Sequence, residues 1–212
     1  MSGAARVFAL WPNADFFYYF IGKFNGKNLD STILQMCETL LTTFSVTAAL
    51  QVWCEVRGLG DGDLFADVHP ESGQLELPPL GVDLIKPITG ETVRHRAITL
   101  TRGDVPLLDA DNWYIPDRLP LQARILLDTT DTPFGKALDG TLQNRETFSA
   151  VLPPRIMDRF NGRKRIRQTV MQASEDVPIL TVRGVVTVDT IPVSFVEERI
   201  RPELAELSVD AA

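Results

Sequence analysis

The sequence predicts an α+β domain in which a largely antiparallel β-sheet carries helices on one face. Two observations support this fold class. Several segments with strand-like patterns follow one another through short turns, and one segment near the start has the apolar repeat of an amphipathic helix. The 212 residues, 44% of them hydrophobic, are enough for one domain with a sizeable core.

Three regions are expected along the chain. Residues 1–28 form an aromatic N-terminal arm, residues 29–200 form the domain, and residues 201–212 form a short acidic tail. The run from Phe16 to Phe20 is expected to pack on the domain, because aromatic side chains bury large areas. It could instead cover a pocket or bind a second copy of the chain, so a homo-oligomer built through the arm stays open.

The first elements follow from apolar spacing. A helix is expected to start at Asp30 or Ser31, both good N-cap residues. Its apolar stripe comprises Ile33, Cys37, Leu40, Leu41 and Phe44. Alternating apolar residues across 46–57 then predict a strand with one buried face. Glycines at 58, 60 and 62 end this element, and residues 59–90 are expected to be a long loop with one or two short elements.

The second half is expected to consist mostly of strands. One spans residues 92–101 and the next residues 105–115, with a tight turn between them. A helix is expected to begin near Pro120, and residues 129–135 are expected to form a polar turn. The inward residues of that helix are predicted to be Leu121, Ile125 and Leu126. A short helix or loop opens at Pro153, and closing strands are predicted at residues 166–172, 178–188 and 191–200.

Charge and hydropathy exclude several classes of partner. The formal net charge of −7 provides no field that would attract nucleic acid or an anionic membrane. One basic run, Arg163 to Arg167, is expected to be a solvated strand entry. The aromatic run is too short to span a bilayer and poorly shaped for a signal peptide, so we expect a cytoplasmic protein.

Cysteine and histidine usage gives no indication of a metal site. Cys37 and Cys54 occupy apolar positions and are predicted to be buried free thiols. His69 and His95 have no partners at metal-ligand spacing, so no structural zinc is expected. The sequence also contains no common catalytic or phosphate-binding motif.

A positive charge stands on an apolar strand face. Arg96 shares one side of its predicted strand with Ile98 and Leu100, so it is expected to point inward. A buried guanidinium needs a carboxylate partner, from the protein or from a ligand. The alternatives are an internal ion pair or a place at the rim of the sheet. Arg94, nearer the strand start, is expected to reach solvent.

A negative charge stands in a similar position on the last strand. Glu197 follows Val193 and Phe195 on one face and is predicted to point inward, whereas Glu198 points the other way. An inward carboxylate is suited to act as a general acid. The alternative is that Glu197 pairs with Arg199 or Arg96 for structural reasons.

Several segments, in their order, resemble the chorismate–pyruvate lyase family. They are His95-Arg96-Ala97-Ile98-Thr99-Leu100, then Asp111-Asn112-Trp113-Tyr114-Ile115-Pro116, then Thr130-Asp131-Thr132-Pro133-Phe134-Gly135-Lys136, and finally the basic run at 162–165. The resemblance covers roughly residues 29–200, and the segment 130–136 is its most specific part. The family's fold, an antiparallel sheet with flaps over an enclosed ligand cavity, is shared by the ligand-sensing domains of some bacterial transcription regulators.

The resemblance implies a site without metal or cofactor. Arg96 would hold the ring carboxylate, the backbone N–H groups around Phe134 and Gly135 would assist, and Asn112 would contribute to substrate binding. A glutamate on the last strand would protonate the leaving pyruvate. Alignment on Pro192 makes that residue Glu197, whereas direct spacing from the basic run puts Arg183 in its place.

Three functions are compatible with these observations. The chain could be a lyase that releases pyruvate from chorismate to give 4-hydroxybenzoate, or a relative acting on a similar small cyclic acid. It could be a non-catalytic domain that senses a small carboxylic acid. It could also be an interaction protein that uses its aromatic arm. No helix-turn-helix pattern is present, so a complete transcription regulator is not expected.

Overall fold

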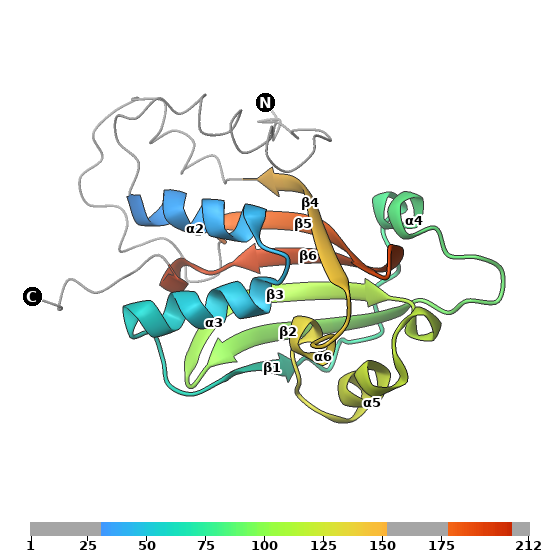
Figure 1. The fold of residues 1–212 in the computed structure, drawn as a ribbon, viewed down its shortest axis with the longest axis horizontal. Coiled ribbons are helices and arrows are strands. Elements are labelled where there is room, and N and C mark those ends of the chain that lie inside the picture. Colours follow the sequence, from blue (N-terminus) through green and yellow to red (C-terminus); the bar gives the residue numbers. More distant parts are fainter. Residues whose placement is uncertain (1–30, 152–177, 205–212) are drawn as a thin grey trace, which may run out of the picture.

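The computed structural model describes residues 31–151 and 178–204, with the side chains of residues 31–34 left out. Six strands form one sheet in the order β1-β2-β3-β6-β5-β4, and every neighbouring pair is antiparallel (Figure 1). The strands are β1 (Leu64–Val68), β2 (Arg94–Arg102), β3 (Val105–Tyr114), β4 (Gln143–Val151), β5 (Leu180–Val188) and β6 (Ile191–Ile200). The predicted α+β class with an antiparallel sheet is confirmed.

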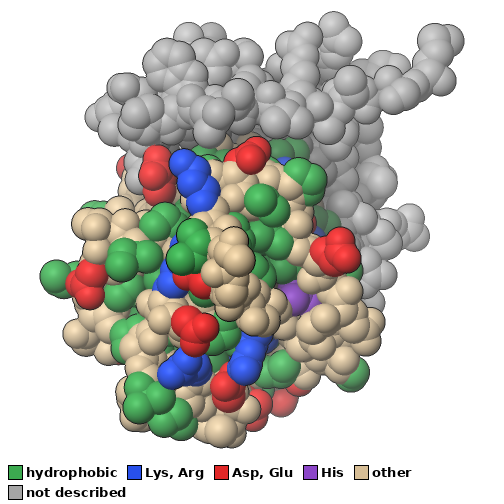
Figure 2. Space-filling model, turned by 90° about the vertical axis from the view of Figure 1, so that its right-hand side faces the viewer, with side chains coloured by type: hydrophobic (Ala, Val, Ile, Leu, Met, Phe, Trp, Pro, Cys, Tyr) green, Lys and Arg blue, Asp and Glu red, His purple; other side chains and the backbone are tan. Residues whose placement is uncertain are grey.

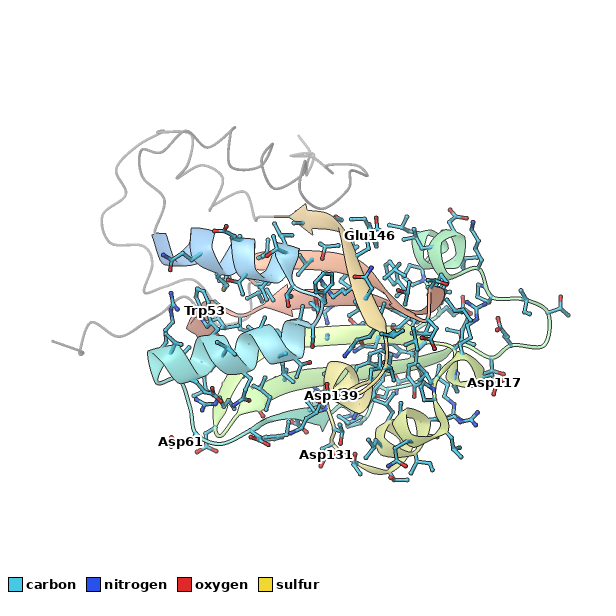
Figure 3. All side chains as sticks on the ribbon, viewed as in Figure 1. Trp53, Asp61, Asp117, Asp131, Asp139 and Glu146 are labelled. Carbon is cyan, nitrogen blue, oxygen red and sulfur yellow. The ribbon has the colours of Figure 1, made fainter. Side chains whose placement is uncertain are left out.

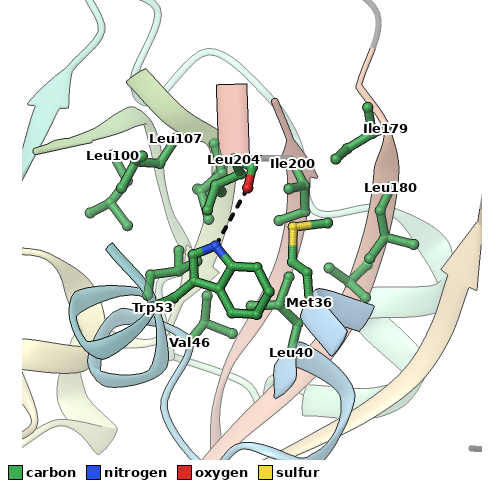
Figure 4. Packing of buried hydrophobic residues seen from close by; sticks show 14 of the residues in the cluster. Met36, Leu40, Val46, Trp53, Leu100, Leu107, Ile179, Leu180, Ile200 and Leu204 are labelled. Atoms are coloured by element: carbon green, nitrogen blue, oxygen red, sulfur yellow. Dashed lines mark hydrogen bonds between the residues drawn. The ribbon is translucent and has the colours of Figure 1, made fainter. Parts of the chain in front are cut away.

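The helices lie mainly on one face of this sheet. They are α2 (Ser31–Thr42), α3 (Val46–Arg57), α4 (Pro79–Ile85), α5 (Leu121–Thr129) and α6 (Phe134–Ala137), with 3-10 turns at Pro116–Arg118 and Pro202–Leu204. Figure 1 shows α2 and α3 side by side and running roughly along the strands, with α5 and α6 nearer the other end of the sheet. The main core fills the space between α2, α3 and the sheet. Figure 4 shows Trp53 in this core, where its Nε1 donates to the carbonyl of Leu204 at 3.4 Å.

The segment 46–57 is a helix, so the predicted strand is wrong. Val46, Leu50, Trp53 and Cys54 are buried at i, i+4, i+7 and i+8, a helical stripe that the apparent alternation concealed. Val52, which the alternation predicted to face inward, is 59% exposed. Two caps at the ends of this segment define the helix.

Those caps are Ser45 and Gly58. The Ser45 hydroxyl accepts the N–H of Ala48, and Gly58 adopts a left-handed conformation with φ of 67°. The preceding helix, α2, begins at Ser31 as predicted and buries Cys37, but Phe44 lies beyond its end and is exposed.

The strand β4 was not predicted. Its buried polar residues are Arg145 and Thr147 on the cavity face and, after a β-bulge, Ser149 on the other face, so the segment lacks the apolar alternation that marks a strand. The helix α5 begins after Pro120 as predicted, but Leu121 and Ile125 are exposed. Its buried residues are Ala123 and Leu127, and Leu126 packs against the same cluster.

The other strands agree closely with the predictions. β2, β3, β5 and β6 occupy the segments predicted at 92–101, 105–115, 178–188 and 191–200. The loop expected at 59–90 contains the short elements β1 and α4. The aromatic arm, the basic run, Pro153 and the strand predicted at 166–172 lie outside the described residues.

Both faces of the sheet are covered, which affects how side-chain alternation is interpreted. The register pairs Arg96 with Asn112 and Asn112 with Val196, so these residues share the face that carries α2 and α3. On the opposite face, Phe195 packs with Trp113 and with Ile85 of α4. β6 therefore has buried apolar residues on both sides.

The surface mixes charges of both signs. Figure 3 shows the labelled acidic side chains Asp61, Asp117 and Asp131 at the periphery of the fold. In the side view of Figure 2, basic and acidic side chains lie interspersed with hydrophobic ones. The ion pair Arg94–Asp128 is exposed, whereas Arg118–Glu91 is largely buried. No helix in the described ranges has the length and apolar character needed to cross a bilayer.

Candidate ligand cavity

A cavity lies between the sheet, the start of α3 and the start of α6. The centres of water-sized molecules can occupy about 50 Å³ of it. We call this space the inner cavity. Its walls are mostly apolar and comprise Phe44, Val46, Ile98, Leu100, Leu108, Ala110, Pro133, Phe134, Gly135, Val186 and Val196, while its polar lining comprises Ser45, Thr47, Asn112, Gln143, Arg145 and Glu198.

A second space adjoins the first at the start of α3. This outer cavity offers about 180 Å³ and is lined by Ser45, Thr47, Ala48, Gln51, Asp63, Leu64, Lys136 and Asp139. Ser45 and Thr47 line both cavities, so the first turn of α3 lies between the two spaces. Lys136 is paired with Asp63 at 2.9 Å, and both side chains are substantially exposed.

A buried ion pair lines the inner cavity. The Arg145 guanidinium donates to Glu198 and to the Thr147 hydroxyl, and the side chains of Arg145 and Glu198 are 3% and 10% exposed. Gly184 leaves room for this guanidinium, because a Cβ at that position would lie 3.3 Å from its Cζ and Nε. Breaking such a pair is costly, because the remaining charge would be buried without a partner.

Asn112 is a polar side chain of the inner cavity with no partner in the protein. The residue is 4% exposed, and no hydrogen bond to its side-chain amide exists within residues 31–151 and 178–204. Buried amides in native proteins nearly always have a partner, in the protein or in a bound molecule. The amide is therefore available to a guest in the cavity.

The start of α3 presents further unpaired donors. In the described part of the chain, the backbone N–H groups of Val46 and Thr47 have no hydrogen-bond acceptor, as expected for the first turn of a helix. Gly135 lies against this turn. A Cβ at position 135 would approach the Thr47 Oγ1 to 2.9 Å and the Ser45 Oγ to 3.1 Å, so a glycine is needed at this contact.

Arg96 is buried, as predicted, but its guanidinium contacts protein carbonyls. It donates to the carbonyl oxygens of Thr132 at 3.0 Å and Thr130 at 3.2 Å. Burial lowers the pKa of Arg96, and Tyr114 and nearby aspartates oppose that shift. The residue is neither at the rim nor in an ion pair among the described side chains. It fixes the segment that leads into Phe134 and Gly135, and it does not line either cavity.

Glu197 and Arg183 lie on the opposite face of the sheet from the cavity. Their strands pair Glu197 with both Asp111 and Arg183, and Arg183 Nε is 2.6 Å from Glu197 Oε2. Arg199 joins the cluster at 3.2 Å from Glu197 and 2.7 Å from Asp111. The predicted pairing of Glu197 with Arg199 is present, whereas an approach to Arg96 is not.

The prediction that Glu198 points away from the interior is therefore wrong. It lies opposite Ala110 on the cavity face, and Glu197 lies on the α4 face. Alternation assigned Glu197 to the side of Val193 and Phe195, which is correct, but both sides of β6 are buried. The alternation of side chains along β6 could not by itself show which face of the sheet holds the cavity.

His95 is also buried on the face away from the cavity. Its Nε2 lies 2.8 Å from Asp111 Oδ1, and its Nδ1 accepts the N–H groups of Gly73 and Leu75. Both ring nitrogens are therefore engaged by the protein. Within the described ranges, no group of three or more His, Cys, Asp or Glu side chains is arranged to hold a metal ion.

The structure brings together part of the predicted site. Asn112, Phe134 and Gly135 line the inner cavity, and Arg96 adjoins it through Thr132. Sequence patterns missed Arg145 and Thr47, because each lay in a segment whose secondary structure was not recognised. Arg145 and Thr147, two positions apart, share the cavity face of β4 and were a signal for a strand with polar residues on that face.

Comparisons with known proteins give limited matches. No family model matches the chain. The protein y4mC of Sinorhizobium fredii (strain NBRC 101917 / NGR234), described as uncharacterized, is 32% identical over 117 residues. That match covers 53% of this chain and 48% of y4mC, so the chain spans about half the length of this curated relative.

Two solved structures have some similarity to the fold. One is the ligand-binding domain of a candidate GntR-family transcriptional regulator from Bordetella bronchiseptica, with a TM-score of 0.41 and 16% identity, covering 66% of this chain and 83% of that one. The other is the possible transcriptional regulator YydK from Bacillus subtilis, with a TM-score of 0.41 and 12% identity, covering 94% and 97%.

Proposed function

We propose that this chain is a small-molecule-binding domain that encloses a small organic acid between its sheet and the starts of α3 and α6. The observation that carries the proposal is Asn112, a buried amide that lines a mostly apolar cavity without a partner among the described residues. Small-molecule sites combine apolar walls with a few placed polar groups, and the inner cavity has this composition. The resemblance of segment 130–136 to the chorismate lyases supports an acid as the guest.

The size of the two cavities limits the ligand. An apolar cavity of about 150 Å³ accepts benzene, whereas the inner cavity offers about 50 Å³ and the outer one about 180 Å³. A ligand the size of a substituted benzoic acid is therefore too large for the inner cavity alone, and it would have to separate Gly135 from Ser45 and Thr47 to occupy both spaces. Larger ligands would require α6 to move.

Binding without catalysis is favoured over pyruvate elimination. The elimination needs a proton donor at the leaving group, and Glu197, the residue assigned to that role, lies on the other face of the sheet. Glu198 lines the cavity, but its carboxylate is engaged by Arg145. A lyase remains the second candidate because this one carboxylate does border the inner cavity.

Calorimetry with 4-hydroxybenzoate and with chorismate tests the proposal. We expect 4-hydroxybenzoate to bind, and the Asn112→Leu variant, which removes the amide at similar volume, to bind it about tenfold more weakly. Asn144→Leu is the matched control. Asn144 is exposed and precedes Arg145 in the sequence, so its substitution should not affect binding. Absence of binding by the unmodified protein would refute the proposal.

Turnover distinguishes the two candidates. Purified protein incubated with chorismate is expected to release neither pyruvate nor 4-hydroxybenzoate. Release of both products, reduced in a Glu198→Gln variant that is still folded, would establish the lyase and replace the binding-only function.

A further inference from the structure

The helix α3 carries a second apolar stripe, which faces away from the core. Its residues are Ala48, Val52 and Val56, and Phe44, just before the helix, continues the interval of four. Phe44, Val52 and Val56 are 68%, 59% and 75% exposed, and Ala48 is exposed as well. We call these four residues the apolar ridge. Positions four apart share one side of a helix, so the ridge is a continuous strip on the surface.

A helix at the surface normally has polar residues on its outer side. The neighbouring helix α2 in Figure 1 follows this rule, because its exposed residues include Gln35, Glu38 and Thr42. The helix α3 instead has apolar residues both toward the core and toward solvent, a composition typical of a helix that is covered on all sides. Val52 and Val56 line neither cavity, so ligand binding does not account for the ridge.

We propose that the aromatic N-terminal arm of the same chain packs on the apolar ridge. The run from Phe16 to Phe20, together with Phe24, is the densest group of aromatic residues in the sequence. Aromatic side chains gain much from burial against apolar surface, and the ridge offers such a surface. This interaction lies beyond the proposed ligand site and does not depend on a bound ligand.

The point at which the arm joins the domain brings it to the ridge. Near the end of α3, Nη2 of Arg57 donates to Oε1 of Gln35 at 3.0 Å, so the start of α2 lies beside the end of α3. From there the ridge extends back along α3 for about 18 Å. The segment between Phe20 and Ser31 can extend about 36 Å, which is enough to place the aromatic run anywhere along the ridge.

A tethered segment suits this ridge better than a second protein does. Stable interfaces between two proteins take about 20–30 residues a side, whereas the ridge is a few residues along one helix. An arm attached beside the ridge is present at an effective concentration of about a millimolar or more. A small apolar contact is then sufficient to hold it, and we infer docking within one chain.

Digestion of the full chain by chymotrypsin, which cleaves after aromatic residues, tests the docking. Cleavage at residues 16–20 is expected to follow the undocked population of the arm. Val52→Lys places a charge on the ridge, and lysine favours a helix more than valine does, so the fold is kept. This variant is expected to be cleaved in the arm about tenfold faster than the unmodified chain.

Ile125→Lys is the matched control for the digestion. Ile125 is also an exposed β-branched residue of a helix, α5, and its substitution should leave the cleavage rate unchanged. Equal rates for Val52→Lys and the unmodified chain would overturn the proposal. Equal acceleration by the two lysine variants would overturn it as well, because the effect would then not depend on the ridge.

Methyl spectra of the full chain locate the arm directly. The methyl protons of Val52 and Val56 are expected to show NOEs to phenylalanine ring protons. In a Phe16→Ala/Phe17→Ala/Phe20→Ala variant these methyl resonances should shift, whereas those of Val82, exposed on α4, should not. Unchanged Val52 and Val56 resonances would contradict the docking. NOEs seen only between differently labelled copies would place the arm on a neighbouring molecule and overturn docking within one chain.

Discussion

Glu197 and Glu198 are neighbours in sequence and face opposite sides of β6, so their surroundings differ at the scale of a single residue. Glu198 shares a buried site with Arg145, whereas Glu197 lies in a partly exposed cluster with Arg183 and Arg199. Loss of one partner from a buried pair leaves a charge without compensation, while a partly exposed pair is screened by solvent.

Neutralising Glu198 should therefore lower stability more than neutralising Glu197. Glu198→Gln is expected to lower the free energy of unfolding by about 3–5 kcal/mol, because Arg145 would remain buried and charged. Glu197→Gln, the matched control, should cost less than about 1 kcal/mol. Urea titrations followed by tryptophan fluorescence measure both, and equal losses would contradict the buried pair.

Arg96 is a positioning residue in this structure, and a second substitution tests that role. Arg96→Lys keeps the charge but cannot span the carbonyls of Thr130 and Thr132 as the planar guanidinium does. Amide hydrogen exchange in residues 130–136 is expected to become about tenfold faster, equivalent to about 1.4 kcal/mol. Arg94→Lys is the control, since Arg94 is exposed, as predicted, and its loss should leave that segment unchanged.

At the scale of elements, α3 shows that the caps decide between helix and strand where the apolar pattern fits both. Segment 46–57 alternates like a strand and also has the stripe Val46, Leu50, Trp53, Cys54. The hydroxyl of Ser45 and the left-handed Gly58 satisfy the ends of a helix, and these groups would have no such role in a strand. Because α3 is a helix, its first turn can face the cavity.

Substitutions at Gly58 test the contribution of this cap. Its φ of 67° is costly for most residues, and no atom lies within 4 Å of a Cβ there, so the cost is conformational alone. Gly58→Ala is expected to lower the unfolding free energy by about 1 kcal/mol. Gly58→Asn should lose less, because asparagine tolerates this conformation better. A ranking in which alanine is the more stable variant would contradict the left-handed cap.

At the scale of the whole molecule, the sheet is buried on both faces and the thiols lie deep in the main core. Cys37 and Cys54 are free and buried, as predicted, although Cys54 lies on a helix and not on the predicted strand. Burial raises the pKa of Cys37 to about 12 and that of Cys54 to about 11. Neither thiol should ionise in the folded protein at neutral pH.

Stability should consequently fall in alkaline solution. Above about pH 9 the unfolded chain loses thiol protons that the folded chain keeps, so the unfolding free energy decreases as pH rises. The thiols are expected to contribute about 3 kcal/mol to the decrease between pH 8 and pH 10, and a Cys37→Ala/Cys54→Ala variant should lose less over the same range. Identical pH profiles for the two proteins would show that the thiols titrate normally.

The sequence by itself determined the α+β class, the antiparallel strands β2, β3, β5 and β6, and the burial of Arg96. Each of these has a local pattern, either apolar alternation or a charge on an apolar face. Such a pattern can be recognised within one segment, without knowing which segments pack against it. It also predicted that Asn112, Phe134 and Gly135 belong to one site, because their segments resemble a known family, and all three line the inner cavity. It could not identify β4, where the buried Arg145 and Thr147 interrupt the apolar pattern and Glu198 and Gly184 accommodate the guanidinium.

Only the tertiary structure decided which face of the sheet holds the cavity. β6 is apolar on both sides, so alternation separates Glu197 from Glu198 without saying which of them meets a ligand. That choice depends on α2, α3 and α6 covering one face and α4 covering the other. The contacts of Arg96 were decided in the same way, since the carbonyls of Thr130 and Thr132 reach it only after the chain has folded back over β2.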